Sequence, residues 1–205
     1  MLKVWGRPNS LNVQKVLLCL EELEIAYDRV DAGMEFGIVK TPEYRALNPN
    51  SRVPTLDDDG FILWESNAIV RYLCAKYTDR MLSPADLQTR AAADRWMDWQ
   101  QTTFNPDMNP IFVTLVRKSR PRDADAIEKL RLASERNAAI VDSLLAQQPF
   151  ISGGIFGMAD LVLAPPLHRW LNLPVERSPR PHLDRWYEAL TARPAAKRVL
   201  TLPIS

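Results

Sequence analysis

The sequence predicts an α/β domain followed by an all-helical domain, because its character changes near residue 80. Before residue 80, short apolar runs that are typical of strands alternate with stretches whose apolar residues repeat at helical spacing. After it, the strand-like runs disappear and amphipathic stretches follow one another. A chain of 205 residues is long enough to bury two compact cores. We therefore expect domains at residues 1–79 and 86–205, with TDRMLS as the linker.

The first half of the chain reads as strand, helix, strand, short helix, hairpin and closing helix. LKVW is the first strand, residues 11–23 carry a stripe of valines and leucines, and AYDRVDA is the second strand. A short helix in residues 41–49 must end before Pro49, because the residue preceding a proline avoids the helical region. DDDG predicts a hairpin within residues 52–66, and residues 66–77 form the closing helix. This order is that of a thioredoxin-like domain.

The second half predicts a series of helices. Ser83 is the expected cap of the first, with Pro84 in the first turn and Asp86 three residues after the cap. That helix should run through RAAADRWMDWQQTTF and be interrupted by the Asn-Pro pairs at 105–106 and 109–110. Further helices are expected around IFVTLVRK, residues 123–147, MADLVLAPPLHRWL and HLDRWYEALTARP.

Composition and charge exclude several classes of function. The formal net charge of +1 gives no field that would favour nucleic acid or an anionic membrane. No apolar run approaches the ~20 residues of a membrane span, and the first residues lack a secretory signal pattern. The two histidines stand apart from other ligand types, so no metal site is expected. Cys19 and Cys74 should be buried, reduced thiols, which favours a cytoplasmic location.

Two small polar residues, Ser10 and Asn12, stand where the first strand passes into the first helix. Ligands of open α/β sheets bind at the carboxyl ends of strands, and the unpaired N–H groups of a helix start favour an anion there. If Ser10 donated a hydrogen bond to a bound thiolate, it would lower the thiol's pKa, at ~1.4 kcal/mol per unit. The alternative is that Ser10 or Asn12 only caps the helix, since both residue types are favoured caps.

Two further pairs could bind parts of a peptide. A cis bond at Val53-Pro54 would free the N–H and C=O of Val53 to pair with an extended peptide, although only ~5% of X–Pro bonds are cis. Glu65-Ser66, at the start of the closing helix, would suit the ammonium and carboxylate of an amino acid; the alternative is an ordinary helix start. The cations near these loops, more often plain surface charges, are Lys40 and Arg52.

Taken together, these residues resemble the cytosolic glutathione transferase family over essentially the whole chain. The resemblance is carried by SLNVQKV, LNPNSRVPTL, LWESNAIVRYL, RWMDW, FGMADLVLAP and RPHLDRWYEALTARPA. It is strongest toward the bacterial B-like, serine/asparagine-type enzymes, which share the WGRxNSxNVxKV opening. The resemblance implies a thioredoxin-like domain that binds glutathione, an all-helical domain that carries the electrophile pocket, a homodimer and no metal.

The resemblance also implies a role for each candidate residue. Ser10 would be the catalytic serine, and Asn12 its neighbour that also reaches the sulfur. The residues that would hold glutathione are Val53 through its backbone, with Pro54 cis, Glu65 and Ser66 at the γ-glutamyl end, and Lys40 and Arg52 at the glycyl carboxylate. The candidate walls of the electrophile pocket are Leu11, Phe36, Trp99, Phe104, Met108, Phe112 and Arg117, most of which could equally be core.

Two departures from the family pattern stand out. Ser51 replaces the usual glycine of NPxGxVP, which should alter the turn before Arg52. Gly157 replaces the usual serine or threonine cap of FGMAD, so only the Asp160 half of the capping box is left. We expect a structural role for Asp160, and a kink or offset at Pro165-Pro166 in the same helix.

The implied function is that of a glutathione transferase, which ionises bound glutathione and transfers it to a small electrophile in detoxification. The B-like resemblance favours a haloacid such as bromoacetate. Two alternatives stay open: a glutathione-dependent disulfide or peroxide reductase that uses the same pocket, and a non-catalytic binding module of the same fold.

Overall fold

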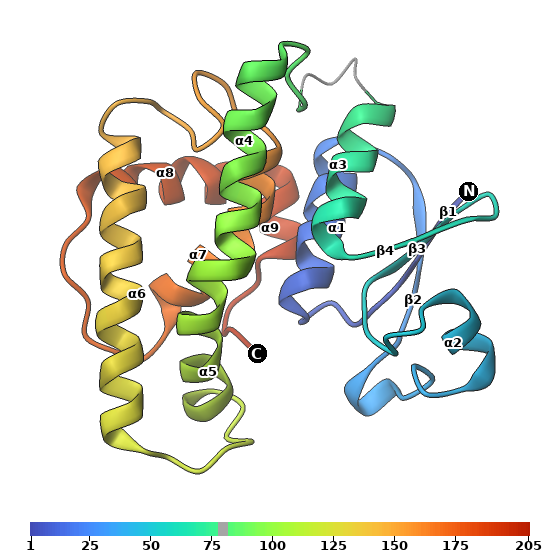
Figure 1. Ribbon diagram of the computed structural model, residues 1–205, viewed down its shortest axis with the longest axis horizontal. Helices are drawn as coiled ribbons and strands as arrows, with labels where there is room; N and C mark the ends of the chain where they lie inside the picture. The colour runs from blue at the N-terminus through green and yellow to red at the C-terminus, as the bar shows by residue number, and fades with distance from the viewer. Residues whose placement is uncertain (78–81) are drawn as a thin grey trace. The chain divides into compact units, whose positions relative to one another are not determined.

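The computed structural model describes residues 1–77 and 82–205. These residues form two compact units, Met1–Ser83 and Pro84–Ser205 (Figure 1). Most of the expected linker TDRMLS, and the expected domain end at residue 79, lie outside the described residues.

The N-terminal unit is built on one four-stranded sheet in the order β2-β1-β3-β4. Its elements are β1 (Leu2–Trp5), α1 (Leu11–Glu22), β2 (Tyr27–Val30), η1 (Met34–Phe36), α2 (Pro42–Leu47), β3 (Thr55–Asp58), β4 (Phe61–Trp64) and α3 (Ser66–Lys76). β1 and β2 are parallel, whereas β1–β3 and β3–β4 are antiparallel. The predicted thioredoxin-like order is confirmed; the short 3₁₀ turn η1 was not predicted.

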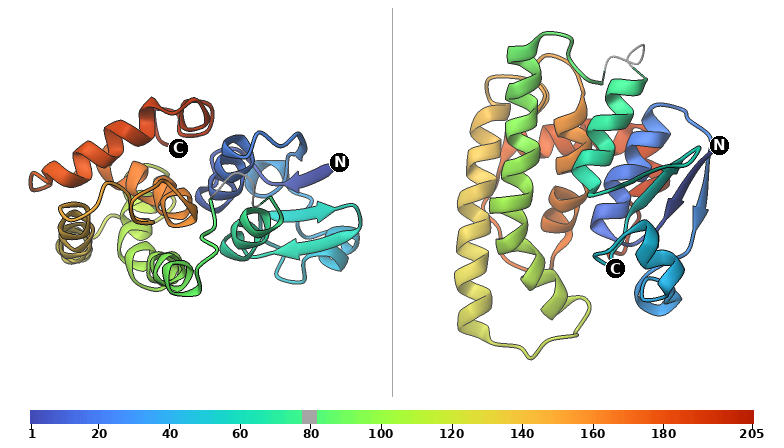
Figure 2. Two further views of the ribbon diagram at one scale, coloured as in Figure 1. Left: turned by 90° about the horizontal axis from the view of Figure 1, so that it is seen from above. Right: turned by 45° about the vertical axis from the view of Figure 1, so that its right-hand side comes forward.

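Helices α1 and α3 pack side by side, and their apolar stripes form the core of this unit (Figures 1 and 2). The buried residues that the two helices bring to this core include Val13, Val16, Leu17, Leu20, Ile69, Val70 and Leu73. Cys19 of α1 and Cys74 of α3 meet in the same interface with their Sγ atoms 3.7 Å apart. Both cysteines are free thiols with no exposed surface, so the prediction of buried thiols is confirmed.

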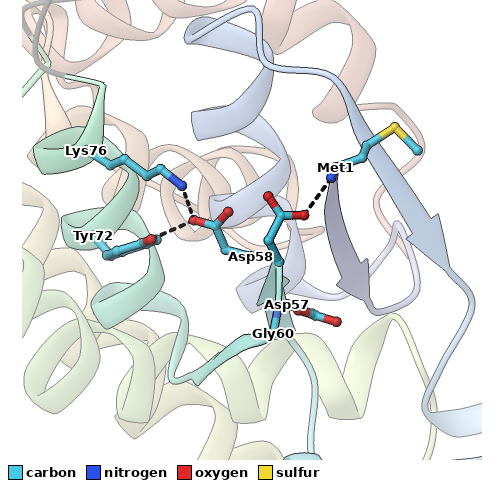
Figure 3. A network of polar contacts seen from close by, with 7 residues as sticks. Met1, Asp57, Asp58, Gly60, Tyr72 and Lys76 are labelled. Atoms are coloured by element: carbon cyan, nitrogen blue, oxygen red, sulfur yellow. Dashed lines mark hydrogen bonds and ion pairs between the residues drawn. The ribbon is translucent and has the colours of Figure 1, made fainter.

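The β3–β4 hairpin is tied to the C-terminal end of α3 (Figure 3). In the turn, Asp57 Oδ1 accepts a hydrogen bond from the Gly60 N–H at 2.7 Å. Beside it, Asp58 accepts hydrogen bonds from the Tyr72 hydroxyl, at 2.5 Å, and from the Lys76 ammonium. These contacts fix the C-terminal end of α3 to the hairpin. The first turn of α3 lies at the other end of the helix, directly after β4.

The C-terminal unit is all-helical in its described residues. Its elements are α4 (Leu87–Trp99), η3 (Gln100–Phe104), α5 (Asn105–Leu115), α6 (Ala124–Leu145), α7 (Met158–Asn172), α8 (Pro181–Ala192) and α9 (Pro194–Val199). The long helix α6 runs beside α5, and α7 packs against α4 and α5 (Figure 2). Across residues 1–77 and 82–205, no helix has the length and apolarity needed to cross a membrane. The short helix α9 was not predicted.

The expected helix start at Ser83 is wrong. Helix α4 begins at Leu87, and the residue that caps it is Asp86, whose carboxylate accepts the Thr89 N–H at 2.7 Å. Aspartate is as good a cap as serine. The acid that the sequence assigned to the first turn is therefore the cap itself.

The Asn-Pro pairs do not interrupt the helix as predicted. Helical residues continue from α4 through η3 and α5 without a break, and η3 is one turn of π-helix. A proline ring clashes with the carbonyl four residues earlier in a regular α-helix. Because the wider π turn precedes Pro106, it offers room for that ring. Pro110 lies inside α5, which still reaches Leu115.

Helix α7 is buried along most of its length, and Asp160 anchors its start. The Asp160 carboxylate accepts hydrogen bonds from the N–H groups of Ile151 (2.8 Å), Ser152 (3.1 Å), Gly157 (3.1 Å) and the indole of Trp186 (2.8 Å). These four hydrogen bonds confirm the structural role expected for Asp160. Gly157, the N-cap residue, has no side chain that could cap the helix. The helix continues across Pro165 and Pro166 to Asn172.

Candidate functional site

One edge of the N-terminal sheet collects the three loops that the sequence singled out. Trp5 at the end of β1 is paired with Thr55 at the start of β3, and Thr55 is paired with Trp64 at the end of β4. Ser10 follows this row by five residues, Pro54 precedes it by one and Glu65 follows it by one. Since β4 runs antiparallel to β3, and β3 to β1, both α1 and α3 start at this edge.

Ser10 is the N-cap residue of α1, but its side chain makes no capping hydrogen bond. Its carbonyl accepts the Gln14 N–H at 2.8 Å, and only 7% of the residue is exposed. The loop before it passes close to α1, since a Cβ on Gly6 would lie 2.4 Å from Val13 Cγ2. The Ser10 hydroxyl is therefore placed at the helix start without being used to cap it.

Asn12 lies in the first turn of α1, where acidic residues are absent. Its Oδ1 atom is buried and has no hydrogen-bond partner among the described residues. A buried acceptor without a donor costs about 1–3 kcal/mol. A ligand that donates a hydrogen bond here would remove that cost, so Asn12 is a second candidate for contact with a ligand.

The Val53–Pro54 peptide bond is cis, as the family resemblance implies. Within the described part of the chain, no hydrogen bond engages the main-chain N–H or C=O of Val53. Val53 is half-buried and Pro54 is buried. An extended peptide laid along this segment would find one donor and one acceptor ready to pair, as at the edge of a sheet.

Helix α2 and its C-cap hold both sides of the cis bond. The Tyr44 hydroxyl donates to the Arg52 carbonyl at 2.7 Å, and the Asn48 amide donates to the same oxygen at 3.0 Å. Both side chains also hydrogen-bond to the Thr55 hydroxyl, at 2.8 and 3.1 Å. The backbone around Val53 is thus fixed from both directions, which keeps its free N–H and C=O in place.

Glu65 and Ser66 form the turn from β4 into α3. Glu65 is the N-cap residue and has φ +72°, in the left-handed region that non-glycine residues seldom adopt. Strain of this kind is concentrated at ligand-binding sites. The Glu65 side chain is exposed, while Ser66 is 4% exposed and opens the helix.

Lys40 and Arg52 lie in the loops on either side of α2, and both side chains are exposed. Ser51, just before Arg52, has φ +54° and accepts a hydrogen bond from the Arg45 side chain at 3.3 Å. The serine thus takes the left-handed conformation in which glycine is usual. The turn before Arg52 is therefore formed with Ser51 in a strained backbone conformation.

The candidate walls of the electrophile pocket differ in exposure. Leu11 is buried and Phe36 is exposed in the N-terminal unit; Trp99 and Arg117 are half-buried in the C-terminal unit. The remaining three, with no exposed surface, are Phe104, Met108 and Phe112. Phe104 stacks on Trp99, and Arg169 lies over the ring of Phe112 at 4.0 Å. These three serve the core here, and their role as pocket walls stays a prediction.

A groove of about 560 Å³ in the C-terminal unit is lined by none of the predicted residues. Arg131, Arg177 and Arg180 contribute to its walls. Each guanidinium is engaged within the protein, with Glu128, with two main-chain carbonyls and with Glu135, respectively. Arg136 lines the same groove, and Arg180 Nε is buried without a hydrogen-bond partner among the described residues.

Sequence reasoning missed Lys15 and Asn67. Lys15 has no exposed surface, and its Nζ donates to Asn67 Oδ1 at 3.1 Å. Burial lowers the pKa of Lys15 to about 7, an effect that the charge of Glu65 opposes. The available signal was a lysine within the apolar run VQKVLLCL together with an asparagine next to Ser66. Among the described residues, no cluster of side chains could hold a metal ion.

The comparisons with known proteins agree with this geometry. Residues 1–75 match the family profile "Glutathione S-transferase, N-terminal domain", and residues 124–189 match "Glutathione S-transferase, C-terminal domain". Glutathione S-transferase GstB of Escherichia coli K12 is 44% identical over 208 residues, which is 100% of both chains. Glutathione S-transferase F11 of Arabidopsis thaliana is 29% identical over 98% of both chains.

Solved structures of the same family superpose on the chain. A theta-class glutathione S-transferase from Xanthomonas axonopodis pv. citri, with glutathione bound, gives a TM-score of 0.94 at 44% identity and covers 100% of this chain and 99% of that one. Poplar glutathione transferase F1 gives 0.88 at 29% identity, covering 97% and 96%. The two matched domains and the full-length relatives show that this chain belongs to the glutathione S-transferase family and is a glutathione transferase.

Proposed function

We propose that glutathione lies extended along the sheet edge from Ser10 past Val53 to Ser66, and that the enzyme transfers it to a small haloacid such as bromoacetate. The observation that supports this most is the row formed by Trp5, Thr55 and Trp64, which brings three separate loops to one edge. A tripeptide needs a place for its sulfur, its backbone and its two ends, and these loops offer all of them.

Ser10 acts on the sulfur. Its hydroxyl makes no capping bond, so it is available to donate to a thiolate at the start of α1. The helix start adds a partial positive charge and unpaired N–H groups. A lowering of the thiol's pKa by about two units would ionise most of an ordinary thiol near neutrality. Asn12 would assist as a second polar contact.

The other predicted residues hold the peptide. Val53 pairs with the cysteinyl backbone through its free N–H and C=O. Ser66 and the first turn of α3 receive the α-carboxylate of the γ-glutamyl end, and the exposed Glu65 accepts its ammonium. Two exposed cations attract the glycyl carboxylate, namely Lys40 and Arg52.

The electrophile binds to the C-terminal domain, where Arg117 steers the carboxylate of a haloacid. The glutathione thiolate attacks the carbon that bears the halogen; a carbon–sulfur bond forms, the carbon–bromine bond breaks and bromide leaves. The thiol proton has already passed to solvent, so the thioether and bromide are the only products of the step. Arg117 is half-buried with its guanidinium 4.9 Å from the centre of the Phe112 ring.

Incubation with glutathione and bromoacetate should yield the S-carboxymethyl thioether faster than the uncatalysed reaction, with saturation in both substrates. Mass spectrometry of the product and release of bromide measure the reaction. Ultraviolet absorbance of the thiolate against pH, in the absence of electrophile, measures ionisation of bound glutathione. A bound thiol that titrates as it does in free solution would contradict the proposal.

The reductase alternative is tested with a mixed disulfide of glutathione and with an organic peroxide. The cysteines of the chain are both fully buried, so a reductase here would depend on glutathione alone as thiol. Turnover of the disulfide or peroxide that exceeds turnover of every haloacid tried would favour the reductase and overturn the haloacid proposal.

We further propose a cytoplasmic homodimer that acts in detoxification, on the strength of the family resemblance. Light scattering of the purified protein should then give twice the chain mass of 23.4 kDa at micromolar concentration. A mass equal to one chain, unchanged on concentration, would contradict the dimer.

A further inference from the structure

Lys15 is a fully buried lysine that links the two helices of the candidate site. It lies in the second turn of α1, one turn beyond the Ser10 cap, and is among the largest side chains with no exposed surface. Its ammonium donates to Asn67 Oδ1 at 3.1 Å, across an interface that joins segments 52 residues apart. Asn67 follows Ser66 directly in the first turn of α3. Figure 1 shows α1 and α3 side by side.

A lysine in this position is costly for the fold. Taking an ammonium out of water carries a penalty of several kcal/mol, which favourable contacts of the ammonium inside the protein have to offset. Its neighbours three and four positions away on α1 are Leu11, Asn12, Leu18 and Cys19, of which only Asn12 is polar. An apolar side chain of similar length would suit this core better, so packing gives no reason for the charge.

The charge faces the start of α3. Glu65, the cap residue of that helix, is the group whose charge raises the pKa of Lys15, against the larger lowering by burial. The other ionisable side chains of the two helices are Glu21, Glu22, Arg71, Tyr72 and Lys76, besides the two cysteines. Glu21 and Glu22 are at the far end of α1, and Lys76 is at the far end of α3.

We propose that Lys15 is a positioning residue of the glutathione site, which holds the first turn of α3 through Asn67 and favours a ligand carboxylate at Ser66 by its positive charge. This inference rests on the proposed function, because it takes the start of α3 as the γ-glutamyl subsite. Lys15 touches neither the sulfur nor the electrophile in this arrangement. It acts on glutathione affinity rather than on the chemical step.

The effect should depend on pH in a defined direction. Because a bound carboxylate favours the charged ammonium, the pKa of Lys15 is higher with glutathione bound than in the free enzyme, where it is about 7. The contribution of Lys15 to affinity is therefore fully present below about pH 7 and is lost as the pH rises through the value in the complex. A residue that only packs would contribute equally at every pH.

The Lys15→Met variant should raise the KM for glutathione about tenfold near pH 6, which corresponds to about 1.4 kcal/mol. Near pH 9 the difference from wild type should shrink to less than about twofold, with kcat and the pKa of the bound thiol unchanged at both pH values. Lys15→Arg should have the wild-type KM for glutathione near pH 6. Near pH 9 its KM should stay low, since a guanidinium stays protonated. Steady-state kinetics across this pH range provides the measurement.

The matched control is Lys76→Met, which removes the same charge from the opposite end of α3, where Lys76 binds Asp58 (Figure 3). It should leave the KM for glutathione unchanged across the pH range. Asn67→Ala keeps the lysine but removes its partner, and should raise the KM near pH 6 as Lys15→Met does. The double variant should raise it no further, since both substitutions remove the contact between Lys15 and Asn67.

Three results would overturn the inference: an unchanged KM in both Lys15→Met and Asn67→Ala, a KM raised by the same factor at every pH, or a loss of kcat without a change in KM. Ser66→Ala separates this failure from failure of the proposed function. If Ser66→Ala raises the KM while the Lys15 and Asn67 variants do not, the glutathione site stands and the inference alone is wrong. If Ser66→Ala also has no effect, the proposed subsite is wrong as well.

Discussion

Replacement of Ser10 by alanine should lower kcat for glutathione conjugation about 25-fold near neutral pH, and up to about 100-fold at lower pH. The reason is that loss of the hydroxyl removes a hydrogen bond to the bound thiolate and raises the pKa of that thiol by about two units. The fraction of ionised sulfur, and with it the rate of attack, falls accordingly. Thiolate absorbance of bound glutathione against pH, together with kcat at several pH values, measures both consequences.

The same variant distinguishes catalysis from helix capping. The Ser10 side chain makes no capping bond, so Ser10→Ala should change the free energy of unfolding by less than about 0.5 kcal/mol. A serine that served only as a cap would cost about 1 kcal/mol and leave the thiol's pKa unchanged. Ser10→Thr retains the hydroxyl and should keep the low pKa of the bound thiol.

Asn12→Ala is the matched comparison, one position into the same helix. The unpartnered atom of Asn12 is Oδ1, an acceptor that cannot donate a hydrogen bond to a thiolate. We therefore expect Asn12→Ala to change the pKa of the bound thiol by less than about one unit. If Ser10→Ala and Asn12→Ala both ionise glutathione as well as the wild type, the catalytic assignment of this helix start is wrong. If only Asn12→Ala fails to ionise it, the asparagine and not the serine holds the sulfur.

Asp160→Asn should cost about 3–5 kcal/mol of unfolding free energy. The buried carboxylate accepts four N–H donors, three from the main chain and one from Trp186. An asparagine amide has one oxygen and two N–H groups, so it accepts fewer of these bonds and turns donors toward donors. Urea unfolding followed by circular dichroism gives the measurement.

Asp142→Asn is the control for this prediction. Asp142 Oδ1 accepts the main-chain N–H groups of His182 and Leu183, each at 2.9 Å, at the start of α8. An asparagine keeps one oxygen in that place, so we expect a cost below about 1 kcal/mol. Equal costs for Asp142→Asn and Asp160→Asn would mean that the four-donor arrangement at Asp160 has no special weight.

Local sequence patterns predicted the elements of this fold well because each has its own signal. The stripe of α1, the DDDG hairpin and the stop before Pro49 depend on neighbours along the chain, and all are present. The errors at Ser83 and at the Asn-Pro pairs have a different cause. Asp86 and Ser83 are both good caps, and sequence does not show that a single wide turn can accommodate Pro106.

The candidate site was predictable only in part. Ser10, Val53 and Ser66 each allow an ordinary structural reading, and the family resemblance rather than any local signal joined them. The strand register shows why they share an edge. The contact between Lys15 and Asn67 spans 52 residues and depends on how two helices pack, which no local pattern encodes.

The paired thiols of Cys19 and Cys74 have a consequence for an enzyme of this chemistry. Reagents such as haloacids alkylate any accessible thiolate, and glutathione disulfide exchanges with it. Both sulfurs lie sealed between α1 and α3, and burial raises the pKa of Cys19 well above its usual value, which keeps its proton in place. Both cysteine thiols are therefore shielded from electrophiles and disulfides in solution. The reactive sulfur of the enzyme is then that of glutathione and not one of its own.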